Sequence, residues 1–470
     1  MLSRDLKLPR RVHFLGICGR MVGGIALALR DLGVRVSGTE VFQFPPMPDL
    51  LREAGIPVNA EWSAENLPKN VDAVITGAML QRGNPELEAA LKRAVPVWNS
   101  TAFLEEYFLR HSQNFVVAGT KGKTTTTAML AWIFKETGLS FDHMIGGQVR
   151  SDLSRVRLTG AKLTVLEGDE YRCGLSDPMP KFLRYHPRHA VLTNVRHDHF
   201  ELYPTPVSYF SVFWDLIGSM PPDGSLTINA DDPRTVSLCS TTPVAVEPVG
   251  FGRNARRRLT HLRENGSGTK FRLDGRDFCL GLAGRMNALN AALASVAAEK
   301  AGVSLKDAAA ALENFPGVEG RMELLKKIGK TIIYTDEAYH PLALAALLEA
   351  AKKRHPRQRL VVIFEPRYTG DRHGICQKEL PDSLRVADLV IAGPHANTFR
   401  FDQPFNDGLF HRELRKRGVR VAPLASMEKA GEAASGLCRE GDIVIIALQT
   451  VHDALIDGIC EAIQQKLHHA

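Results

Sequence analysis

Residues 114–138 have the sequence NFVVAGTKGKTTTTAMLAWIFKETG, which reads as a β-strand, a glycine-rich turn and an α-helix in direct succession. Glycines let backbone N–H groups curl around an anion, and the N-terminus of the following helix adds a favourable dipole. Lys123 can reach the outer phosphates of a nucleotide, and Thr124 can offer its hydroxyl to Mg²⁺. The strict GxxxxGK[ST] pattern is not met, because Val117 and Ala118 occupy its early positions. The order of strand, turn and helix still favours a phosphate-binding loop over a purely structural glycine turn.

Two apolar runs further along the chain end in residues that can bind a metal. LTVL is followed directly by Glu167, and HAVLTNVRHDH (189–199) ends in Asp198 and His199. The carboxyl ends of parallel strands meet at one edge of a sheet, so we expect Glu167 and His199 to lie beside the phosphate loop. Strand-end acids and histidines are also often solvated loop residues. The convergence of three strand ends favours the metal site, with Thr124, Glu167 and His199 serving Mg²⁺.

The chain before this stretch shows a second glycine-rich turn. VHFLGI (12–17) predicts a strand that runs into Gly16 and Gly19, with a helical pattern after them. A second predicted strand, VRVSGTE (34–40), ends in Glu40, near the place where dinucleotide-binding folds put a ribose-binding acid. A tight strand–helix turn explains this weak pattern nearly as well. Two glycine turns in two α/β units suggest two different phosphorylated ligands.

Strands alternate with helical segments along the whole chain, which predicts parallel sheets and an α/β fold. The third part of the chain has four apolar runs of strand type, at residues 331–336, 360–366, 387–393 and 442–448. We place domain boundaries at 1–111, 112–316 and 317–470, with a linker around Leu109–Asn114 and a basic hairpin over 253–280.

Composition narrows the class of protein. A chain of 470 residues with 44% hydrophobic residues predicts two to four globular domains. No apolar run is long enough to span a membrane, the start MLSRDLKLPRR has no apolar signal core, and seven scattered cysteines without a CxxC pair predict neither zinc nor disulfides. These features predict a reduced, cytoplasmic enzyme. The net charge of +7 would permit nucleic-acid binding, but the basic run Arg253–Arg258 comes with no nucleic-acid-binding signature.

With these residues in place, the chain resembles the Mur ligase family of ATP-dependent amide-forming enzymes. The resemblance covers nearly the whole length, and the matching motifs occur in the family's order: GTKGKTTT (119–126), EGDEY (167–171), TNVRHDH (193–199), NADD (229–232), GRMNALNAALA (284–294), FPGVEGRME (315–323) and YTDEAYHP (334–341). It implies three domains: a Rossmann-like UDP-sugar domain, a P-loop ATPase domain, and an α/β domain that closes on ATP and binds the amine.

Motifs of the first domain point to one branch of the family. HFLGICG (13–19), FPPMPDLL (44–51) and RGNP (82–85) resemble the branch that acts in peptidoglycan recycling. That branch joins the murein tripeptide L-alanyl-γ-D-glutamyl-meso-diaminopimelate to the carboxylate of UDP-N-acetylmuramate through an acyl phosphate. The resemblance thus implies ATP and Mg²⁺ as cofactors, small-molecule substrates, no nucleic acid, no membrane insertion, and a monomer or weak homodimer.

The resemblance also implies a role for each matching residue. It assigns ATP binding to Gly119, Thr120, Lys121, Gly122, Lys123, Thr124, Thr125, Asn287, Arg321 and Asp336. It assigns the UDP-sugar to Gly16, Cys18, Gly19 and Glu40, and magnesium to Thr124, Glu167 and His199. It makes Lys123, Glu167, His199 and Arg321 catalytic, and it places His340 and Arg367 on the substrate side.

Several positions depart from the family's pattern. Lys121 and Tyr339 each replace a usual histidine, Thr335 replaces an acid, and the stretches 367–370 and 448–452 are altered. These changes concentrate on the acceptor side. They leave two alternatives open: a ligase that adds L-alanine to the same UDP-sugar acid, and a nucleotide-binding relative that has lost ligase activity.

Overall fold

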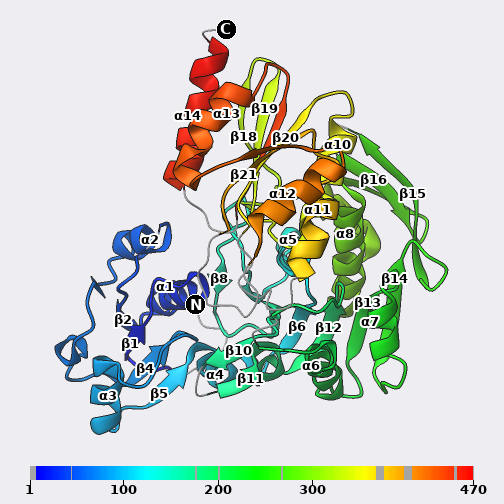
Figure 1. Ribbon diagram of the computed structural model, residues 1–470. Helices are drawn as coiled ribbons and strands as arrows, with labels where there is room; N and C mark the ends of the chain where they lie inside the picture. The colour runs from blue at the N-terminus through cyan, green and yellow to red at the C-terminus, as the bar shows by residue number, and fades with distance from the viewer. Residues whose placement is uncertain are drawn as a thin grey trace.

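The computed structural model describes residues 7–43, 45–174, 177–199, 202–265, 268–366, 375–395, 405–448 and 453–468. It contains three large β-sheets, each packed against helices, so the α/β class predicted from the sequence is confirmed (Figure 1). In Figure 1 the blue part of the chain holds the first sheet, the cyan and green part holds the second, and the yellow to red part holds the third. No helix among the described residues is long and apolar enough to cross a membrane.

The first sheet is wholly parallel, with strand order β3-β2-β1-β4-β5. Its helix α1 buries Val22, Ile25 and Leu29, which recur at helical spacing and form one apolar stripe. The strands predicted at 12–17 and 34–40 are confirmed. The elements are β1 (Arg11–Leu15), α1 (Arg20–Asp31), β2 (Arg35–Thr39), α2 (Met47–Glu53), β3 (Val58–Asn59), the 3₁₀ turn η1 (Ala64–Asn66), β4 (Ala73–Thr76), α3 (Pro85–Lys92), β5 (Val97–Asn99), α4 (Ser100–Leu104) and the π-helical turn η2 (Glu105–Leu109).

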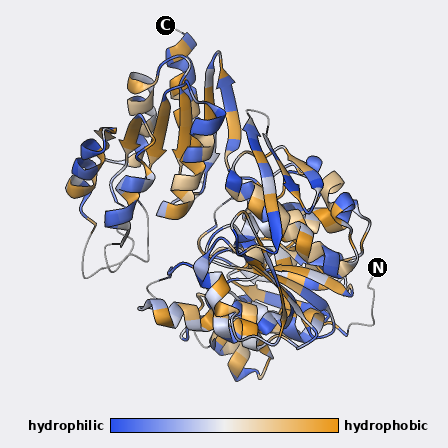
Figure 2. Ribbon diagram, turned by 90° about the vertical axis from the view of Figure 1, so that its right-hand side faces the viewer, coloured by the Kyte–Doolittle hydropathy of each residue, from blue (hydrophilic) through white to orange (hydrophobic). Residues whose placement is uncertain are grey.

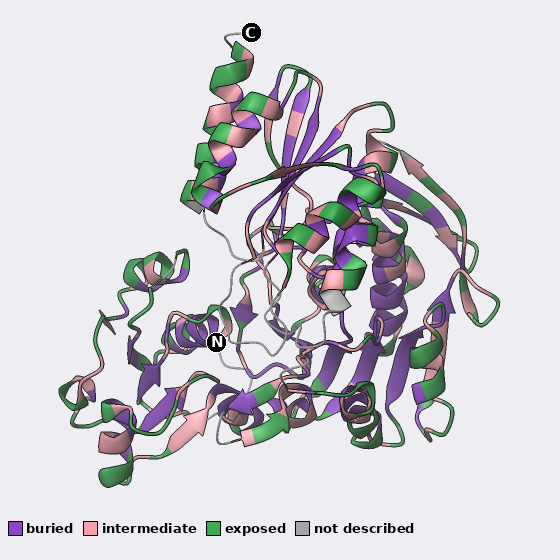
Figure 3. Cartoon of the chain, viewed as in Figure 1, coloured by how far each residue is buried: buried purple, intermediate pink, exposed green. Residues whose placement is uncertain are grey.

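The central sheet has ten strands in the order β17-β16-β15-β14-β13-β12-β6-β9-β7-β8. Strand β6 is buried on both faces: Phe115 and Val117 pack with the apolar side chains of α5 and α8, whereas Val116 and Ala118 pack with those of α6. Covered faces explain why NFVVA is a continuous apolar run. Figure 3 shows α5, α8 and the neighbouring strands largely in the buried colour.

The predicted basic hairpin is confirmed as the antiparallel strands at the β17 end of this sheet. The elements of the central part are β6 (Gln113–Ala118), α5 (Lys123–Glu136), β7 (Asp142–Met144), β8 (Val156–Arg157), β9 (Leu163–Glu167), β10 (Arg172–Gly174), β11 (Asp177–Pro180), η3 (Lys181–Tyr185), β12 (Pro187–Leu192), α6 (Pro206–Gly218), β13 (Ser225–Asn229), α7 (Pro233–Leu238), β14 (Ala245–Gly250), β15 (Arg257–Asn265), β16 (Gly268–Leu273), β17 (Arg276–Leu280), α8 (Arg285–Ala298), η4 (Glu299–Ala301) and α9 (Leu305–Glu313).

The third sheet has the order β18-β19-β23-β20-β21-β22 and is parallel except for its edge strand β18. Alternate residues of β20 face two separate apolar clusters, and Figure 2 shows these strands as an apolar layer between helices. All four strands predicted in this part are confirmed. The elements are β18 (Glu323–Ile328), β19 (Thr331–Asp336), α10 (Pro341–Arg354), β20 (Leu360–Phe364), α11 (Ile375–Ser383), β21 (Leu389–Ala392), α12 (Asp407–Lys416), β22 (Arg420–Pro423), η5 (Met427–Lys429), α13 (Ala430–Leu437), β23 (Ile443–Ala447) and α14 (Asp453–His468).

The connection between the first and central sheets runs over exposed residues, Arg110, His111 and Gln113, and is anchored at both ends. Leu109 and Asn114, the ends of the expected linker, are both buried. Asn114 Nδ2 donates to the carbonyl oxygens of Leu109 at 2.9 Å and Tyr185 at 2.7 Å. The connection therefore falls where the sequence predicts the linker, and the buried Asn114 side chain hydrogen-bonds the backbone at its end.

Candidate active site

The phosphate loop joins the end of β6 to the start of α5. Gly119 has φ +130° and Gly122 has φ +86°, and a Cβ on Gly119 would lie 2.7 Å from the carbonyl oxygen of Asn194. Only glycine fits this backbone without strain. No side chain caps the N-terminus of α5 at Gly122, so the first N–H groups of that helix point toward the loop. The loop thus has the geometry of an anion site.

Lys123 is the buried cation of this loop. Its Nζ donates to the Gly119 carbonyl oxygen at 2.7 Å and to Glu170 Oε2 at 3.0 Å. Burial disfavours the charged form, but the charges of Glu170, Asp169 and Glu167 outweigh burial and raise the pKa of Lys123. The ammonium is therefore protonated at neutral pH and is held at the mouth of the loop.

Thr124 and Glu167 meet as the strand-end argument predicts. The Thr124 hydroxyl donates to Glu167 Oε1 at 2.7 Å, and the Gly146 backbone N–H donates to Oε2, also at 2.7 Å. Burial and the neighbouring Asp169 raise the pKa of Glu167, although Thr124 and Lys123 act in the opposite direction. A carboxylate and a hydroxyl beside a phosphate loop fit Mg²⁺, which is usually bound through one or two carboxylates, phosphate oxygens and water.

His199 lies next to a carboxylate that the sequence reasoning missed. Its Nε2 is 3.4 Å from Glu170 Oε1 rather than beside Glu167. Glu170 is fully buried and also accepts from the Tyr209 hydroxyl at 3.1 Å. Burial alone would raise the pKa of Glu170, but Lys123 and His199 lower it to about 2. Among the described residues, no three His, Cys, Asp or Glu side chains form a ready-made metal cluster.

The strand-end argument selected Glu167 because it directly follows the apolar run, and it gave no role to the second glutamate of EGDEY, Glu170. The available sequence signal was the pair of glutamates, Glu167 and Glu170, three residues apart at the end of one strand. A buried lysine on the loop needs a buried counter-charge, and Glu170 supplies it.

Lys121 connects the central and third parts of the chain. Its Nζ lies 3.0 Å from Asp198 Oδ2 and 4.9 Å from the centre of the Tyr339 ring. Asp198 is the second buried acid that sequence reasoning left without a role. The two positions that depart from the family's histidines therefore touch each other.

Two further predicted residues, Arg321 and Asp336, come from the third part of the chain. Arg321 Nη1 donates to Glu337 Oε2 at 3.0 Å. Asp336 accepts from the backbone N–H groups of Met322 at 2.6 Å and Ala338 at 2.7 Å, and burial raises its pKa to about 6. Asp336 thus lies at the carboxyl end of β19, on the same side as Arg321.

His340 and Asn287 each hydrogen-bond the backbone near the start of a helix. His340 Nδ1 accepts from the Leu342 N–H at 3.2 Å and caps α10, and burial and Lys121 lower its pKa to about 3. Asn287 Nδ2 donates to the Ala283 carbonyl oxygen at 2.7 Å. One turn further along α8, Asn290 approaches Gly122, so this face of α8 borders the loop. Asn290 was not predicted. Arg367 and residues 449–452 lie outside the described residues.

The glycine turn of the first sheet assembles its predicted residues. Gly16, at φ +85°, donates to the Thr39 carbonyl oxygen at 2.9 Å, and Gly19 N–H donates back to Gly16 at 3.3 Å. Burial and the charge of Glu40 raise the pKa of Cys18 to about 11, so its sulfur is a thiol. Burial likewise raises the pKa of Glu40. These side chains meet at the carboxyl end of β1 and β2, where α/β folds bind ligands.

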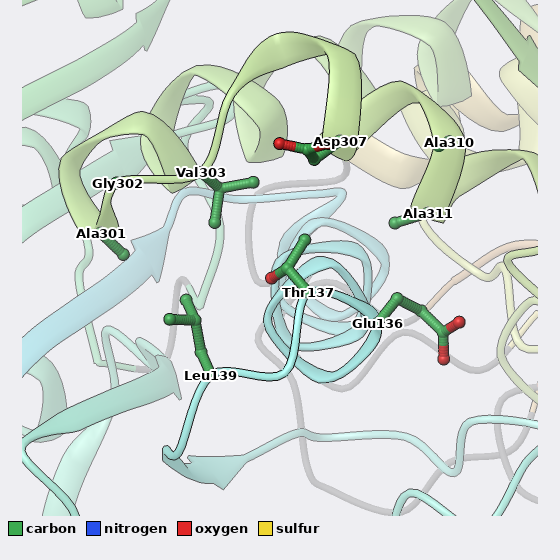
Figure 4. A pocket seen from close by; sticks show the side chains of 9 residues that line it. All are labelled: Glu136, Thr137, Leu139, Ala301, Gly302, Val303, Asp307, Ala310 and Ala311. Atoms are coloured by element: carbon green, nitrogen blue, oxygen red, sulfur yellow. The ribbon is translucent and has the colours of Figure 1, made fainter.

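A hollow of about 480 Å³ lies at the opposite end of α5 from the phosphate loop (Figure 4). It is lined by Glu136, Thr137, Leu139, Ala301, Gly302, Val303, Asp307, Ala310 and Ala311. None of these residues belongs to the site predicted from the sequence, so this hollow is separate from the candidate active site.

Three family models match the chain in succession. Residues 11–112 match the catalytic domain of the Mur ligase family, residues 117–298 match the Mur ligase middle domain, and residues 320–447 match the Mur ligase glutamate ligase domain. Together these models account for most of the chain.

Two relatives have the same level of identity but different names. The UDP-N-acetylmuramate–L-alanyl-γ-D-glutamyl-meso-2,6-diaminoheptandioate ligase of Escherichia coli (strain K12) is 33% identical over 387 residues, covering 81% of this chain and 84% of the relative. The UDP-N-acetylmuramate–L-alanine ligase of Halorhodospira halophila (strain DSM 244 / SL1) is 34% identical over 451 residues, covering 93% of this chain and 90% of the relative.

Solved structures show the same arrangement. A murein peptide ligase from Psychrobacter arcticus 273-4 matches with a TM-score of 0.72 and 26% identity over 97% of this chain and 98% of the other. A UDP-N-acetylmuramate–alanine ligase from Thermotoga maritima matches with a TM-score of 0.78 and 23% identity over 97% of this chain and 98% of the other. At that level of identity the match shows the fold alone. The architecture is the three-domain one of the Mur ligases, and the chain belongs to the Mur ligase family.

Proposed function

We propose that this protein is an ATP-dependent, ADP-forming ligase that joins the murein tripeptide L-alanyl-γ-D-glutamyl-meso-diaminopimelate to the lactyl carboxylate of UDP-N-acetylmuramate. The E. coli relative carries the name of that ligation, and the P. arcticus structure is a murein peptide ligase. The observation that carries the proposal is the phosphate loop itself: Lys123 pairs with Glu170 and Thr124 with Glu167.

The first half of the reaction activates the carboxylate. A carboxylate is a poor acyl donor, so its oxygen first attacks the γ-phosphorus of ATP, the bond to the ADP oxygen breaks, and an acyl phosphate forms. This transfer needs positioning and neutralisation of spreading negative charge more than covalent help. Lys123 supplies a fixed cation, and the N–H groups at the start of α5, which no side chain caps, would face the phosphates.

Amide formation is the second half of the reaction. The amine of the peptide attacks the acyl carbon, loses a proton and displaces phosphate through a tetrahedral intermediate. Thr124, Glu167 and His199 would hold Mg²⁺, which neutralises charge on phosphate oxygens when bound. Arg321 and Asp336 would meet the nucleotide from the third domain, which has to close over the loop.

The acceptor has a second candidate, L-alanine, because the H. halophila relative is named for that ligation and is as similar as the E. coli one. The test is phosphate release from ATP with UDP-N-acetylmuramate and Mg²⁺, comparing tripeptide with L-alanine and identifying the product by mass. We expect product with tripeptide. Product with L-alanine alone would support the alternative, and no phosphate release with either acceptor would indicate a nucleotide-binding relative without ligase activity.

We also propose a cytoplasmic location, domain limits of 1–111, 112–316 and 317–470, a monomer or weak homodimer, and no nucleic-acid partner. The last point is supported by the basic hairpin, because two of its arginines, Arg256 and Arg257, lie beside acids of this chain. Arg257 binds Glu299 at 2.7 Å and also Asp274, and Arg256 lies 4.0 Å from Glu247.

A further inference from the structure

Each of the three domains contributes one arginine to a cluster around Glu337. Arg20, the first residue of α1, places Nη1 3.1 Å from Glu337 Oε1. Arg321 of the third domain places Nη1 3.0 Å from Glu337 Oε2. Arg155, just before β8 in the central domain, interacts electrostatically with Arg20, Glu319 and Glu337. The cluster lies where the three domains meet.

The backbone of Arg155 ties it to the magnesium-site carboxylate. Its carbonyl oxygen accepts from the Ile145 N–H at 2.8 Å. The next residue along the chain, Gly146, donates its N–H to Glu167 Oε2 at 2.7 Å. Only two hydrogen bonds and one peptide unit therefore separate Arg155 from Glu167.

On its other side, Arg155 adjoins the helix that follows the first glycine turn. Val156 packs so closely on α1 that a Cβ at Gly24 would lie 2.6 Å from Val156 Cγ2. Gly24 is four residues after Arg20, so the two share one face of α1. Arg155 thus lies between the glycine turn predicted to bind the UDP-sugar and the predicted magnesium site.

The guanidinium of Arg155 is not fully satisfied by the protein. Its Nη1 is buried and has no hydrogen-bond partner within the part of the chain that the structure describes. Burial and the nearby Arg20 lower the pKa of Arg155, yet a guanidinium remains charged in proteins. Leaving such a charged donor buried and unpaired is costly, which makes the site a strong place for an anion.

We propose that Arg155 binds the lactyl carboxylate of UDP-N-acetylmuramate and orients it for phosphorylation. The inference rests on the proposed function, because it needs a ligand with its diphosphate at Gly16–Gly19 and its carboxylate at the phosphate loop. Arg155 lies between these two positions. An arginine suits the task, since its planar fork fixes the orientation of a carboxylate as well as its position.

The test measures dissociation constants by calorimetry for three ligands: UDP-N-acetylmuramate, the same compound with its lactyl carboxylate converted to an amide, and UDP. We expect the wild-type protein to bind the acid at least about tenfold more tightly than the amide, as a charge-assisted hydrogen bond implies. Arg155→Met should abolish that preference and leave the affinities for the amide and for UDP within about twofold of wild type.

Arg157→Met is the matched control. Arg157 lies two residues further along, is exposed, and donates to the Phe141 carbonyl oxygen at 3.2 Å, away from the cluster. Arg157→Met should keep the wild-type preference for the acid over the amide. Arg155→Lys retains the charge but not the fork, so it should keep part of the preference, and it serves if Arg155→Met does not fold. ATP binding and the thermal midpoint report on folding in each variant.

The outcomes separate the two proposals. A preserved preference for the acid in Arg155→Met would overturn the inference while leaving the proposed function intact. An equal loss of affinity for all three ligands would also overturn it, since it would place Arg155 at the diphosphate instead. A wild-type protein that binds UDP but not UDP-N-acetylmuramate would contradict the proposed function and the inference together.

Discussion

The contact between α1 and β8 differs in kind from the contacts that α1 and the phosphate loop make with the third domain. At the first, apolar side chains of α1, such as Ile25 and Leu29, belong to the same buried cluster as Val156 and the central-sheet residue Val116. At the second, the described contacts include half-exposed ion pairs, such as Arg20–Glu337, and the Lys121–Tyr339 stack. The two apolar clusters of the third domain contain no residues of the other two.

This difference predicts which of the two contacts opens and closes. A continuous apolar interface resists separation because opening it exposes its surface to water. Polar contacts exchange readily with water, and domains joined by them are expected to move. We therefore expect the first and central domains to form one rigid unit that holds Lys123, Glu170 and Glu167 in place, and the third domain to close and open. Charges inside the rigid unit should accordingly matter more than contacts at the mobile joint.

The largest effect is expected from Lys123→Met. Loss of the loop cation should lower kcat by about 10³-fold or more in the phosphate-release assay, since charge neutralisation is the main contribution to phosphoryl transfer. The variant should also be less stable by about 3–5 kcal/mol in denaturant unfolding, because Glu170 is left buried without its partner.

The double variant Lys123→Met/Glu170→Gln separates these two effects. It should recover most of the lost stability and none of the lost activity. Recovered activity would show that Lys123 acts only by supporting the fold.

Glu170→Gln alone should lower kcat by about 10²-fold. The amide keeps the shape of the side chain but no longer fixes the Lys123 ammonium, whose misplacement weakens its effect on the phosphates. Tyr209→Phe is the matched control, because it keeps the charge of Glu170 and removes only the hydrogen bonds of the Tyr209 hydroxyl, at 3.1 Å to Glu170 Oε1 and at 3.0 Å to Thr120 Oγ1, so it should cost less than about tenfold. Equal losses in the two variants would argue that Glu170 merely packs the site.

The difference between Glu167 and Glu170 shows how far sequence reasoning reaches. Glu167 follows its strand directly, and parallel topology brings that strand end to the phosphate loop, so its contact with Thr124 was predictable. Glu170 lies in the turn after the strand, where no periodic rule sets the direction of a side chain. Its role depends on Lys123, 47 positions away, and on desolvation that only the folded protein imposes.

Lys121 illustrates the same limit at a different place. Its sequence position left open whether it binds phosphate or faces solvent. In the structure it pairs with Asp198 and lies over Tyr339. Both partners are distant in sequence, and one belongs to another domain. Strands and helices were recovered because burial on both faces produces unbroken apolar runs, whereas pairing across domains leaves no local pattern.

The third prediction concerns pH at the mobile domain. The pKa of Asp336 is raised by burial to about 6, so this carboxyl is protonated below that pH and ionised above it. A ribose hydroxyl binds best to the ionised form. The dissociation constant of ATP should therefore rise about tenfold from pH 7 to pH 5, as expected for one proton. Asp336→Asn should bind ATP weakly at both values, and an unchanged pH profile in it would refute the assignment.

The same group affects stability with a definite sign. A carboxyl whose pKa is higher in the folded than in the unfolded state stabilises the fold most below its unfolded value of 3.8, and that contribution is lost as the pH rises through about 6. The unfolding free energy of Asp336→Asn should lack this decline, and calorimetric melts at pH 4 and 7 would measure it.

The smallest effect is expected at the mobile joint itself. Tyr339→Leu removes the ring face that Lys121 lies over, whereas Tyr339→Phe keeps it. A partly exposed cation–π contact contributes about 0.5–1 kcal/mol, so the leucine variant should lose about threefold in kcat/KM and the phenylalanine variant much less. The loss should appear in the KM for ATP if the contact favours the closed state. A threefold loss in Tyr339→Phe as well would show that the Tyr339 hydroxyl, and not the ring face, causes the effect. A loss in Tyr339→Leu as large as that of Glu170→Gln would mean that the contact between Lys121 and Tyr339 is part of the rigid unit.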